Sequence, residues 1–457
     1  MSIKSARIVS NGEGQIYHFE TFDSMDERMH RGSKLWQILP CLGVALLCIP
    51  FGVMLGWPSP TYLELLSEES PLPISIVQSP MIAGFLMFGN IIATPFSGWS
   101  LYGSKYAILL SLIAMSIGWT LIWQATDIYY LLGGRLIIGL GNGYAVGHVK
   151  TYINEMSEGN LASILTRLVN IFMIIGVVLS YIIGIFTNFR SFPPIIVAVT
   201  IAIFSIIFFV PHTPSEYVFF KKLRQAKKML RRLKPAANPE IELAILKGKV
   251  VEPHLSIIAV FRESSLRKNL FILILTTFIQ QFSGAPATIV YCQFIFYYLY
   301  VPSPEICAIT YSLIFLFCNI LSTFYLNRFP KKTVLFISCF FSLLSLCATV
   351  CAIYLNLKEY WEFIPLVTML AYITSHTSGL GAVPFTFSEY LFPKNARRSI
   401  SQLQIMFFSI FAVIITKLFQ VFYSAFEFYA IFALFASIAA FGCIFILIAI
   451  PTKPYQQ

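Results

Sequence analysis

Residues 168–186 read LVNIFMIIGVVLSYIIGIF, an apolar run of 19 residues without a charged side chain. The hydrocarbon core of a bilayer is about 30 Å thick, and a helix needs about 20 apolar residues to cross it. The run is therefore long enough to form a transmembrane helix. It carries one amide side chain, Asn170.

The rest of the chain has the same character. Of its 457 residues, 57% are hydrophobic and 12% are charged, whereas a soluble domain is roughly 25% charged. This composition argues against disorder and against an ordinary water-soluble enzyme. We expect an all-α polytopic membrane protein with 12 transmembrane helices. The expected spans, in order, are residues 35–56, 80–101, 106–123, 129–151, 168–186, 193–210, 269–291, 305–326, 333–355, 364–387, 400–422 and 428–450.

Lysine and arginine gather in alternate loops between these spans. Five precede residue 35 and thirteen lie between Lys221 and Lys268, but the opposite loops hold only Arg190 and Lys358. Because basic loops face the cytoplasm, we expect a multi-pass protein of the plasma membrane with both termini cytoplasmic. The same arrangement accounts for the net charge of +11 without a nucleic-acid partner. The partners we expect are the lipid bilayer and a small neutral solute.

The longest break between apolar runs divides the chain into two groups of six spans. We expect an N-tail (1–34), a first half (35–210), a cytoplasmic linker (211–268), a second half (269–450) and a C-tail (451–457). Two six-helix halves joined in this way are typical of secondary transporters, whose solute site lies between the halves at mid-membrane.

Within the linker, apolar side chains recur at helical spacing among basic residues, which predicts a basic amphipathic helix. The apolar positions are Phe219, Leu223, Ala226, Leu230 and Leu233. We favour a solvated connector that touches anionic headgroups over a partner-binding site.

Glycine and proline mark close packing and bends. Gly139, Gly143 and Gly147 form a stripe of small residues that allows two helices to approach closely. Pro50, Pro286 and Pro384 are expected to bend their helices. These bends would serve either as hinges for gating or as passive kinks.

Five short motifs lie in order along these spans and their loops. They are Gly134-Arg135, Tyr152-Ile-Asn-Glu155, Pro211-His-Thr-Pro214, Gln280-Gln-Phe-Ser-Gly284 and Ser388-Glu-Tyr-Leu-Phe-Pro393. With these motifs the chain resembles the sugar porter family of the major facilitator superfamily, and within it insect facilitated trehalose transporters. The resemblance covers nearly all of residues 35–453 and implies the major facilitator fold of two six-helix halves.

The resemblance also implies a sugar site between the halves. The residues that match the sugar contacts of the family are Gln280, Gln281, Asn170, Tyr291 and Phe385. Buried amides in an apolar span are costly unless they are paired. An amide supplies donors and acceptors, which suits neutral hydroxyl groups better than ions. The alternative for the two glutamines is a satisfied hydrogen bond between helices.

Ionisable residues near the span ends match a charge network of the family. The resemblance implies that Glu155, Glu389 and Arg397 hold the outward-open state. Arg135 lies nearer the external side, and in proton-coupled relatives its partner is an aspartate in the first span. The matching position here is Met54, and the first span contains no carboxylate. We therefore expect a uniporter.

Several positions at the expected site depart from the family pattern. Pro286 and Phe408 stand where the family has asparagine, Phe385 where it has tryptophan, and Asn170 where it has glutamine. A site that recognises hydroxyl groups discriminates through satisfied polar contacts. The departures should weaken sugar binding or shift the preference toward a less polar solute.

These observations predict facilitated diffusion of a sugar, trehalose or a hexose, by alternating access. The sequence holds no nucleophile–base motif and no metal-ligand cluster, so we expect no enzyme activity, no cofactor and no metal. Two alternatives stay open. One is a solute sensor that descends from a sugar porter and does not transport. The other is a carrier of another small organic solute, proton-linked through His148.

Overall fold

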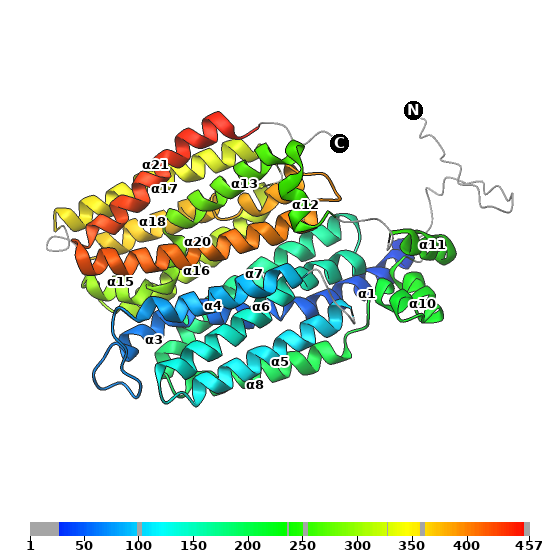
Figure 1. Ribbon diagram of the computed structural model, residues 1–457, viewed down its shortest axis with the longest axis horizontal. Coiled ribbons are helices and arrows are strands. Elements are labelled where there is room, and N and C mark those ends of the chain that lie inside the picture. Colours follow the sequence, from blue (N-terminus) through cyan, green and yellow to red (C-terminus); the bar gives the residue numbers. More distant parts are fainter. Residues whose placement is uncertain are drawn as a thin grey trace.

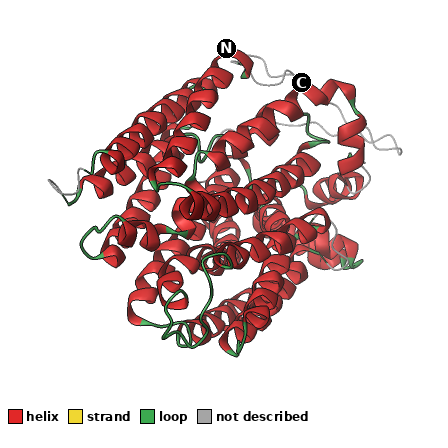
Figure 2. Cartoon of the chain, turned by 60° about the vertical axis from the view of Figure 1, so that its left-hand side comes forward, coloured by secondary structure: helices red, strands yellow, loops and turns green. Residues whose placement is uncertain are grey.

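The structure is a computed structural model that describes residues 27–97, 103–234, 237–249, 255–326, 328–356 and 362–451. This part of the chain consists of helices and connecting turns and contains no β-strand, as Figure 2 shows. The expected all-α fold is confirmed. Most of the two expected tails, and Lys358, lie outside the described residues.

We group the helices by the expected halves, although α1 begins within the expected N-tail, at Glu27, and α13 within the expected linker, at Ser264. The first half holds α1 (Glu27–Ala45), α2 (Cys48–Gly56), α3 (Pro58–Leu65), α4 (Ser79–Ala93), η1 (Thr94–Phe96), α5 (Ser104–Trp123), α6 (Ile128–Met156), α7 (Gly159–Phe186) and α8 (Phe192–Phe209). The linker holds α9 (Pro214–Phe219), α10 (Leu223–Leu233), α11 (Pro239–Lys249) and α12 (Ile257–Arg262). The second half holds α13 (Ser264–Phe282), α14 (Ala285–Val290), α15 (Cys292–Tyr298), α16 (Pro304–Tyr325), α17 (Lys331–Tyr354), α18 (Ile364–Ser378), η3 (Pro384–Thr386), α19 (Phe387–Tyr390), α20 (Arg397–Ala425) and α21 (Tyr429–Ala449).

Ten helical segments of the described chain are long and apolar enough to cross a membrane. The expected spans that are absent from this set belong to α6 and α18. Helix α6 is rich in glycine and contains Arg135, and α18 has only 15 residues. The chain is a multi-pass membrane protein, and the count of twelve spans stays a prediction.

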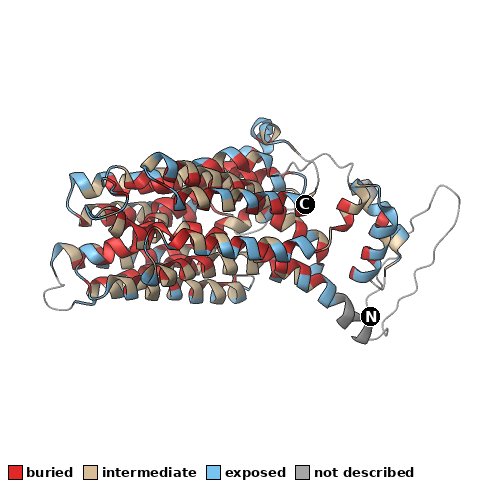
Figure 3. Cartoon of the chain, turned by 90° about the horizontal axis from the view of Figure 1, so that it is seen from below, coloured by how far each residue is buried: buried red, intermediate tan, exposed pale blue. Residues whose placement is uncertain are grey.

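The two halves lie side by side as bundles of long helices (Figure 1). Helices α10 and α11 project from one end, which we call the linker end, and α1 begins and α21 ends there (Figure 1). Helices α3 and α15 lie at the opposite end, which we call the far end (Figure 1). Buried residues fill the interior of the bundles and exposed residues lie along the outside (Figure 3). Because much of that outside is apolar, for example Leu110 and Ile201, it suits contact with lipid.

The glycine stripe on α6 packs against α4. A Cβ atom on Gly143 would lie 2.5 Å from the carbonyl oxygen of Asn90, and one on Gly147 would lie 2.7 Å from that of Ser97. A Cβ atom on Gly139 would meet the carbonyl oxygen of Leu86. The predicted close packing is confirmed, because any larger side chain would separate the two helices.

Two spans of the second half are interrupted. The seventh expected span breaks at Gly284, whose φ of +106° places it in the left-handed region, and Pro286 lies in the first turn of α14. The tenth breaks between α18 and η3, and Pro384 opens η3. Proline at these positions costs little because the first turn of a helix needs no amide donor. The interruptions lie beside the expected sugar site.

The linker differs from the expectation of one continuous amphipathic helix. The chain turns at Lys221, whose φ is +58°, so that Phe219 belongs to α9 and stays exposed. On α10, Ala226 and Leu230 are buried against Leu243 of α11. The apolar face of α10 is therefore covered by protein and does not reach lipid.

Candidate functional site

Gln280 and Gln281 lie at the end of α13, where the seventh span is interrupted. Each is 2% exposed. The Gln280 amide nitrogen donates to the carbonyl oxygen of Gly381 at 2.8 Å, which joins α13 to the loop before η3. Within the part of the chain that the structure describes, the Oε1 atoms of both glutamines have no hydrogen-bond partner. The break therefore presents two amide oxygens that could accept hydrogen bonds from hydroxyl groups.

Side chains of α18 hold this break together. The Tyr372 hydroxyl donates to the carbonyl oxygen of Ser283 at 2.9 Å. His376 Nε2 lies 3.3 Å from the carbonyl oxygen of Gln280. These contacts satisfy backbone groups that an interrupted helix would otherwise leave unpaired in an apolar interior.

Thr377 follows His376 and adds a third polar atom without a partner. Its side chain is 1% exposed, and its hydroxyl makes no hydrogen bond with any described residue. The sequence reasoning missed Thr377, because one hydroxyl in an apolar helix usually bonds to the backbone of its own helix.

Phe385 lies in η3, at the interruption of the tenth span. Its ring centroid is 5.5 Å from that of Phe408 on α20. The Gln404 amide donates to the carbonyl oxygen of Pro384 at 2.7 Å, which joins η3 to α20 beside the two rings. Phe385 and Phe408, which differ from the tryptophan and asparagine of the resembled family, are thus in contact with each other.

Tyr291 lies at the far end, where it seals the contact between the halves. Its ring centroid is 5.1 Å from that of Tyr62 in the first half and 4.6 Å from that of Phe419 in the second. Its hydroxyl is 3.3 Å from Ser79 Oγ, and the Tyr62 hydroxyl donates to the Ser79 carbonyl oxygen at 2.7 Å. We call Tyr62, Ser79, Tyr291 and Phe419 the far-end seal.

Another contact joins the halves beside the far-end seal. The Gln293 backbone amide donates to Ser59 Oγ at 3.1 Å. It joins α15 of the second half to α3 of the first half.

Asn170 is exposed on α7, and the structure gives it no hydrogen bond to a described residue. No hydrogen bond joins it to Gln280 or Gln281 in the described chain. The structure therefore brings Gln280 to the loop before η3 and Phe385 to α20. It places Tyr291 in the far-end seal and leaves Asn170 exposed on α7.

Arg135 is fully buried on α6 and has no carboxylate partner among the described residues. Its Nη1 donates to the carbonyl oxygen of Met54 at 2.7 Å, and its Nε donates to that of Ile82 at 3.0 Å. The guanidinium lies 5.3 Å from the ring centroid of Trp57. Backbone carbonyls and an aromatic ring surround Arg135 where the resemblance implies an aspartate in proton-coupled relatives. One of these carbonyls belongs to Met54, the residue at the matching position.

Glu155, Glu389 and Arg397 lie at the linker end. None of the three forms an ion pair within the described residues. Arg397 Nε donates instead to the carbonyl oxygen of Phe392 at 3.3 Å. Within the described chain, the charge network that the resemblance implies is therefore not closed by an ion pair.

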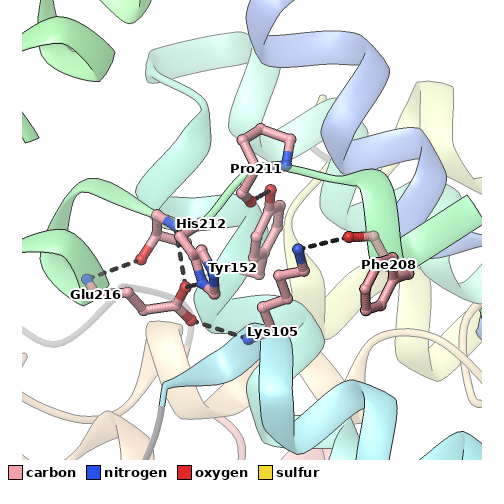
Figure 4. A network of polar contacts seen from close by, with 7 residues as sticks. Lys105, Tyr152, Phe208, Pro211, His212 and Glu216 are labelled. Atoms are coloured by element: carbon pink, nitrogen blue, oxygen red, sulfur yellow. Dashed lines mark hydrogen bonds and ion pairs between the residues drawn. The ribbon is translucent and has the colours of Figure 1, made fainter. Parts of the chain in front are cut away.

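A buried carboxylate that the sequence reasoning missed braces the linker end (Figure 4). Glu216 accepts hydrogen bonds from the backbone amides of Lys105 at 2.9 Å and Thr213 at 3.1 Å, and it lies 3.0 Å from His212 Nδ1. The Lys105 ammonium donates to the carbonyl oxygen of Phe208 at 2.8 Å. These contacts join α5, α8 and α9. The pattern Thr-x-x-Glu, a capping-box signal, could have indicated this role.

A tyrosine extends this brace to α6. The Tyr152 hydroxyl donates to the carbonyl oxygen of Pro211 at 2.7 Å, as Figure 4 shows. The described residues contain no group of three or more His, Cys, Asp or Glu side chains that could hold a metal ion.

The sequence matches a family model described as "Sugar (and other) transporter" over residues 64–453. The chain is similar to the facilitated trehalose transporter Tret1 of Bombyx mori, with 23% identity over 431 residues that cover 91% of this chain and 84% of the relative. It is also similar to Tret1 of Apis mellifera ligustica, with 24% identity over 91% of this chain and 85% of the relative. Sugar transporter ERD6-like 8 of Arabidopsis thaliana is 27% identical over 76% of this chain and 75% of that protein.

The fold is similar to solved structures of the xylose transporter XylE from E. coli. Its inward open conformation has a TM-score of 0.77 at 15% identity and covers 90% of this chain and 96% of that one. Its partially occluded inward open conformation has a TM-score of 0.76 at 15% identity and covers 93% and 100%. The fold is thus that of the major facilitator superfamily. Since the family model covers most of the sequence, the chain belongs to the sugar (and other) transporter family.

Proposed function

We propose that this protein is a facilitative transporter, a uniporter and not an enzyme, that moves a small neutral sugar across the plasma membrane by alternating access. Trehalose or a hexose is the proposed solute. Similarity to trehalose transporters over 91% of the chain supports this choice. In this proposal the linker end and both termini face the cytoplasm, as the distribution of basic residues favours.

One observation carries the proposal. Gln280 and Gln281 each keep a buried amide oxygen without a partner at the break of the seventh span. A buried acceptor without a hydrogen bond costs about 1–3 kcal/mol, and a solute that donates to these oxygens for part of the cycle would offset that cost. Discontinuous helices near the membrane midplane are where secondary transporters bind solutes. Two acceptors beside the Phe385 and Phe408 rings suit a sugar, which has hydroxyl donors and an apolar ring face.

Contacts between the halves support alternating access. The far-end seal closes one end, whereas Glu155, Glu389 and Arg397 at the linker end form no ion pair in the described chain. Hydrogen bonds from Gln402 to Ser97 and from Arg167 to Thr323 still join the halves near the linker end. With the linker end in the cytoplasm, this arrangement corresponds to a partly closed inward-facing state in this proposal. Pairing of the three charged residues would then belong to the outward-facing state.

The surroundings of Arg135 support uniport. Proton coupling through this arginine needs a carboxylate that takes up and releases a proton beside it. Arg135 donates instead to the backbone carbonyl oxygens of Met54 and Ile82, which do not titrate. The positive charge of Arg135 is therefore structural in this proposal.

A proton-linked carrier of another organic solute is the second candidate. His148 is 3% exposed, and its Nε2 has no hydrogen-bond partner among the described residues. A histidine with an unpaired ring nitrogen could carry a proton between the two sides. In that case an imposed proton gradient would drive uphill uptake, and His148→Gln would abolish the drive.

Uptake of radiolabelled trehalose and glucose into oocytes tests the proposed site. We expect uptake of at least one sugar above the background of control oocytes, and we expect Gln280→Ala with Gln281→Ala to lower it about tenfold or more. Gln225→Ala on the exposed surface of α10 is the matched control and should leave uptake unchanged. All variants are compared at equal surface expression.

Two results would count against the proposal. Unchanged uptake in the double variant would remove the glutamines from the site. Absence of net flux for every sugar, in a protein that still binds sugar, would favour the non-transporting sensor.

A further inference from the structure

We infer that the junction of α9 and α10 binds anionic phospholipid headgroups of the leaflet at the linker end. The surface consists of Phe219, Lys221, Lys222 and Arg224, and we call it the headgroup surface. The inference rests on the membrane-spanning fold and does not depend on which solute the protein carries.

A lipid-facing stripe on α5 indicates where the headgroup surface lies relative to the membrane. Tyr106, Leu110, Ile113 and Ile117 are between 45% and 57% exposed and recur at the spacing of one helix face. Exposed apolar residues in this pattern on a spanning helix face lipid. The ring centroid of Tyr106, at the linker end of the stripe, is 6.3 Å from that of Phe220. The end of α9 therefore lies where the lipid-facing surface of α5 ends.

Phe219 continues the apolar surface beyond this point. It is 62% exposed, and its ring centroid is 5.5 Å from that of Phe220. An exposed aromatic ring beside lysines is the composition of a segment that lies in the membrane interface. Lys221 and Lys222 follow directly and lie on the same turn of chain, before α10 begins.

Some basic residues of the α9–α11 region are paired with a carboxylate or stacked on a ring, and others are not. Lys227 pairs with Glu240 at 2.6 Å, Lys234 pairs with Glu158 and Glu242, and Arg232 stacks 4.3 Å from the Trp36 ring centroid. The exposed basic residues without an ion pair in the described chain are Lys221, Lys222, Arg224, Lys228 and Arg231. Five positive charges in eleven residues make a surface that attracts anions.

Helix α10 holds this surface in a fixed orientation. Ala226 and Leu230 are buried against α11, and the Gln37 amide of α1 donates to the carbonyl oxygen of Leu233 at 2.8 Å. Arg224, Lys228 and Arg231 recur at helical spacing on the face opposite the buried one. The charges are thus presented by a packed helix.

These features favour a lipid over an acidic protein as the partner. Clusters of four to eight basic residues directly beside a transmembrane helix bind anionic lipids, and Arg and Lys suit phosphate oxygens. The lipid-facing stripe and the exposed Phe219 place apolar surface beside the charges. A lipid would contact both the charges and this apolar surface, whereas a soluble acidic protein would need only the charges.

Native mass spectrometry of the full chain tests the inference. The purified protein is equilibrated with an equimolar mixture of phosphatidylserine and phosphatidylcholine, and the ratio of the retained lipids is measured. Each basic residue near the surface favours anionic lipid about fivefold. We therefore expect enrichment of phosphatidylserine by the wild type, and a loss of about tenfold or more in K221Q/K222Q/R224Q.

Two further variants distinguish binding at the headgroup surface from a general effect of the protein's positive charge. R262Q/R267Q/K268Q removes three exposed basic residues at the end of α12 and the start of α13, at the same end of the molecule, and should lower the enrichment less than K221Q/K222Q/R224Q does. K221R/K222R/R224K should keep the enrichment, because the charges remain. Equal retention of both lipids by the wild type, or an equal loss in the two glutamine variants, would overturn the inference. Retention of polyglutamate without enrichment of phosphatidylserine would overturn it in favour of an acidic protein.

Discussion

Arg135 shows how a charge is accommodated inside a helix bundle without a counter-charge. Its guanidinium satisfies the carbonyl oxygens of Met54 and Ile82 and lies against Trp57. Carbonyl dipoles and a ring face stabilise a cation while leaving nothing to titrate.

Replacing Arg135 should destabilise the first half. Arg135→Met would leave the carbonyl oxygens of Met54 and Ile82 without donors, which costs about 1–3 kcal/mol for each buried group. We expect a lower thermal unfolding temperature in detergent, measured by differential scanning fluorimetry, and a smaller decrease for Arg135→Lys. Equal unfolding temperatures for Arg135→Met and the wild type would show that these contacts add no stability.

The sequence indicated which types of side chain lie at the site, but it indicated much less about which hydrogen bonds those side chains make. The amides at Gln280 and Gln281 could be identified from their cost in an apolar span. That Gln280 uses its nitrogen on Gly381 and leaves its oxygen unpaired depends on how two interrupted spans meet. Tyr291 was expected at the sugar site, but it lies in the far-end seal, because its place depends on the position of Tyr62 in the other half.

At the scale of helix pairs, the crossing of α4 and α6 decides how closely the first half packs. Gly139→Leu would place a side chain against the Leu86 backbone and should destabilise the protein by about 1–3 kcal/mol or more, as overpacking does. Gly133 lies on the same helix, and a Cβ atom added there would have no neighbouring atom within 4 Å. Gly133→Leu is therefore the matched control and should not lower stability, since replacing a glycine inside a helix gains about 0.5–1 kcal/mol. Thermal unfolding of both variants checks this, and equal effects would contradict the packing account.

The far-end seal should control which way the transporter faces. Tyr62→Ala removes a ring that stacks on Tyr291 across the two halves, worth about 0.5–1.5 kcal/mol. The hydrogen bond from Tyr62 to Ser79 lies within the first half and does not enter this difference. The outward-facing population should rise about fivefold, and the KM for external sugar should fall relative to the KM for internal sugar. Zero-trans uptake and efflux measure the two constants.

Tyr423→Ala is the control for the seal. Tyr423 contacts Phe294, Tyr298 and Phe428, all in the second half, so its loss should leave the ratio of the two KM values unchanged. A ratio that responds equally to both variants would show that the seal does not act between the halves.

At this scale, helix positions were largely predictable, because long apolar runs bounded by loops leave few alternatives. The linker was less predictable. Apolar spacing from Phe219 to Leu233 indicated one helix, but the turn at Lys221 divides it. Helix α11 covers the apolar face of α10. The sequence of α10 alone does not show that another helix of the linker packs on it.

On the scale of the whole molecule, Lys234 attaches the linker to the first half. Burial alone would lower the pKa of Lys234, but Glu158 at 2.6 Å and Glu242 at 2.8 Å raise it above its usual value. A raised folded-state pKa means that the pairs stabilise the protein below the unfolded pKa of about 10.4. The contribution is lost as pH rises through the folded-state pKa.

Lys234→Met should therefore lower the unfolding temperature at pH 8, and its difference from the wild type should shrink at pH 11. The loss should be about 1 kcal/mol or less, because the pairs are partly solvated. Lys227→Met, whose pair with Glu240 is more exposed, should cost less. A difference that persists unchanged at pH 11 would show that packing of the lysine stem, and not its charge, stabilises the linker.

The central claim, that the two halves carry a neutral sugar without coupling to protons, is tested most directly in proteoliposomes. Purified full-length protein is reconstituted, and uptake of radiolabelled trehalose and glucose is followed with and without an imposed proton gradient. We predict net uptake of at least one sugar that ends at equal concentrations inside and outside, with the same end point under both conditions. Accumulation above the external concentration when the gradient is imposed, or no uptake of any sugar by folded protein, would contradict the account.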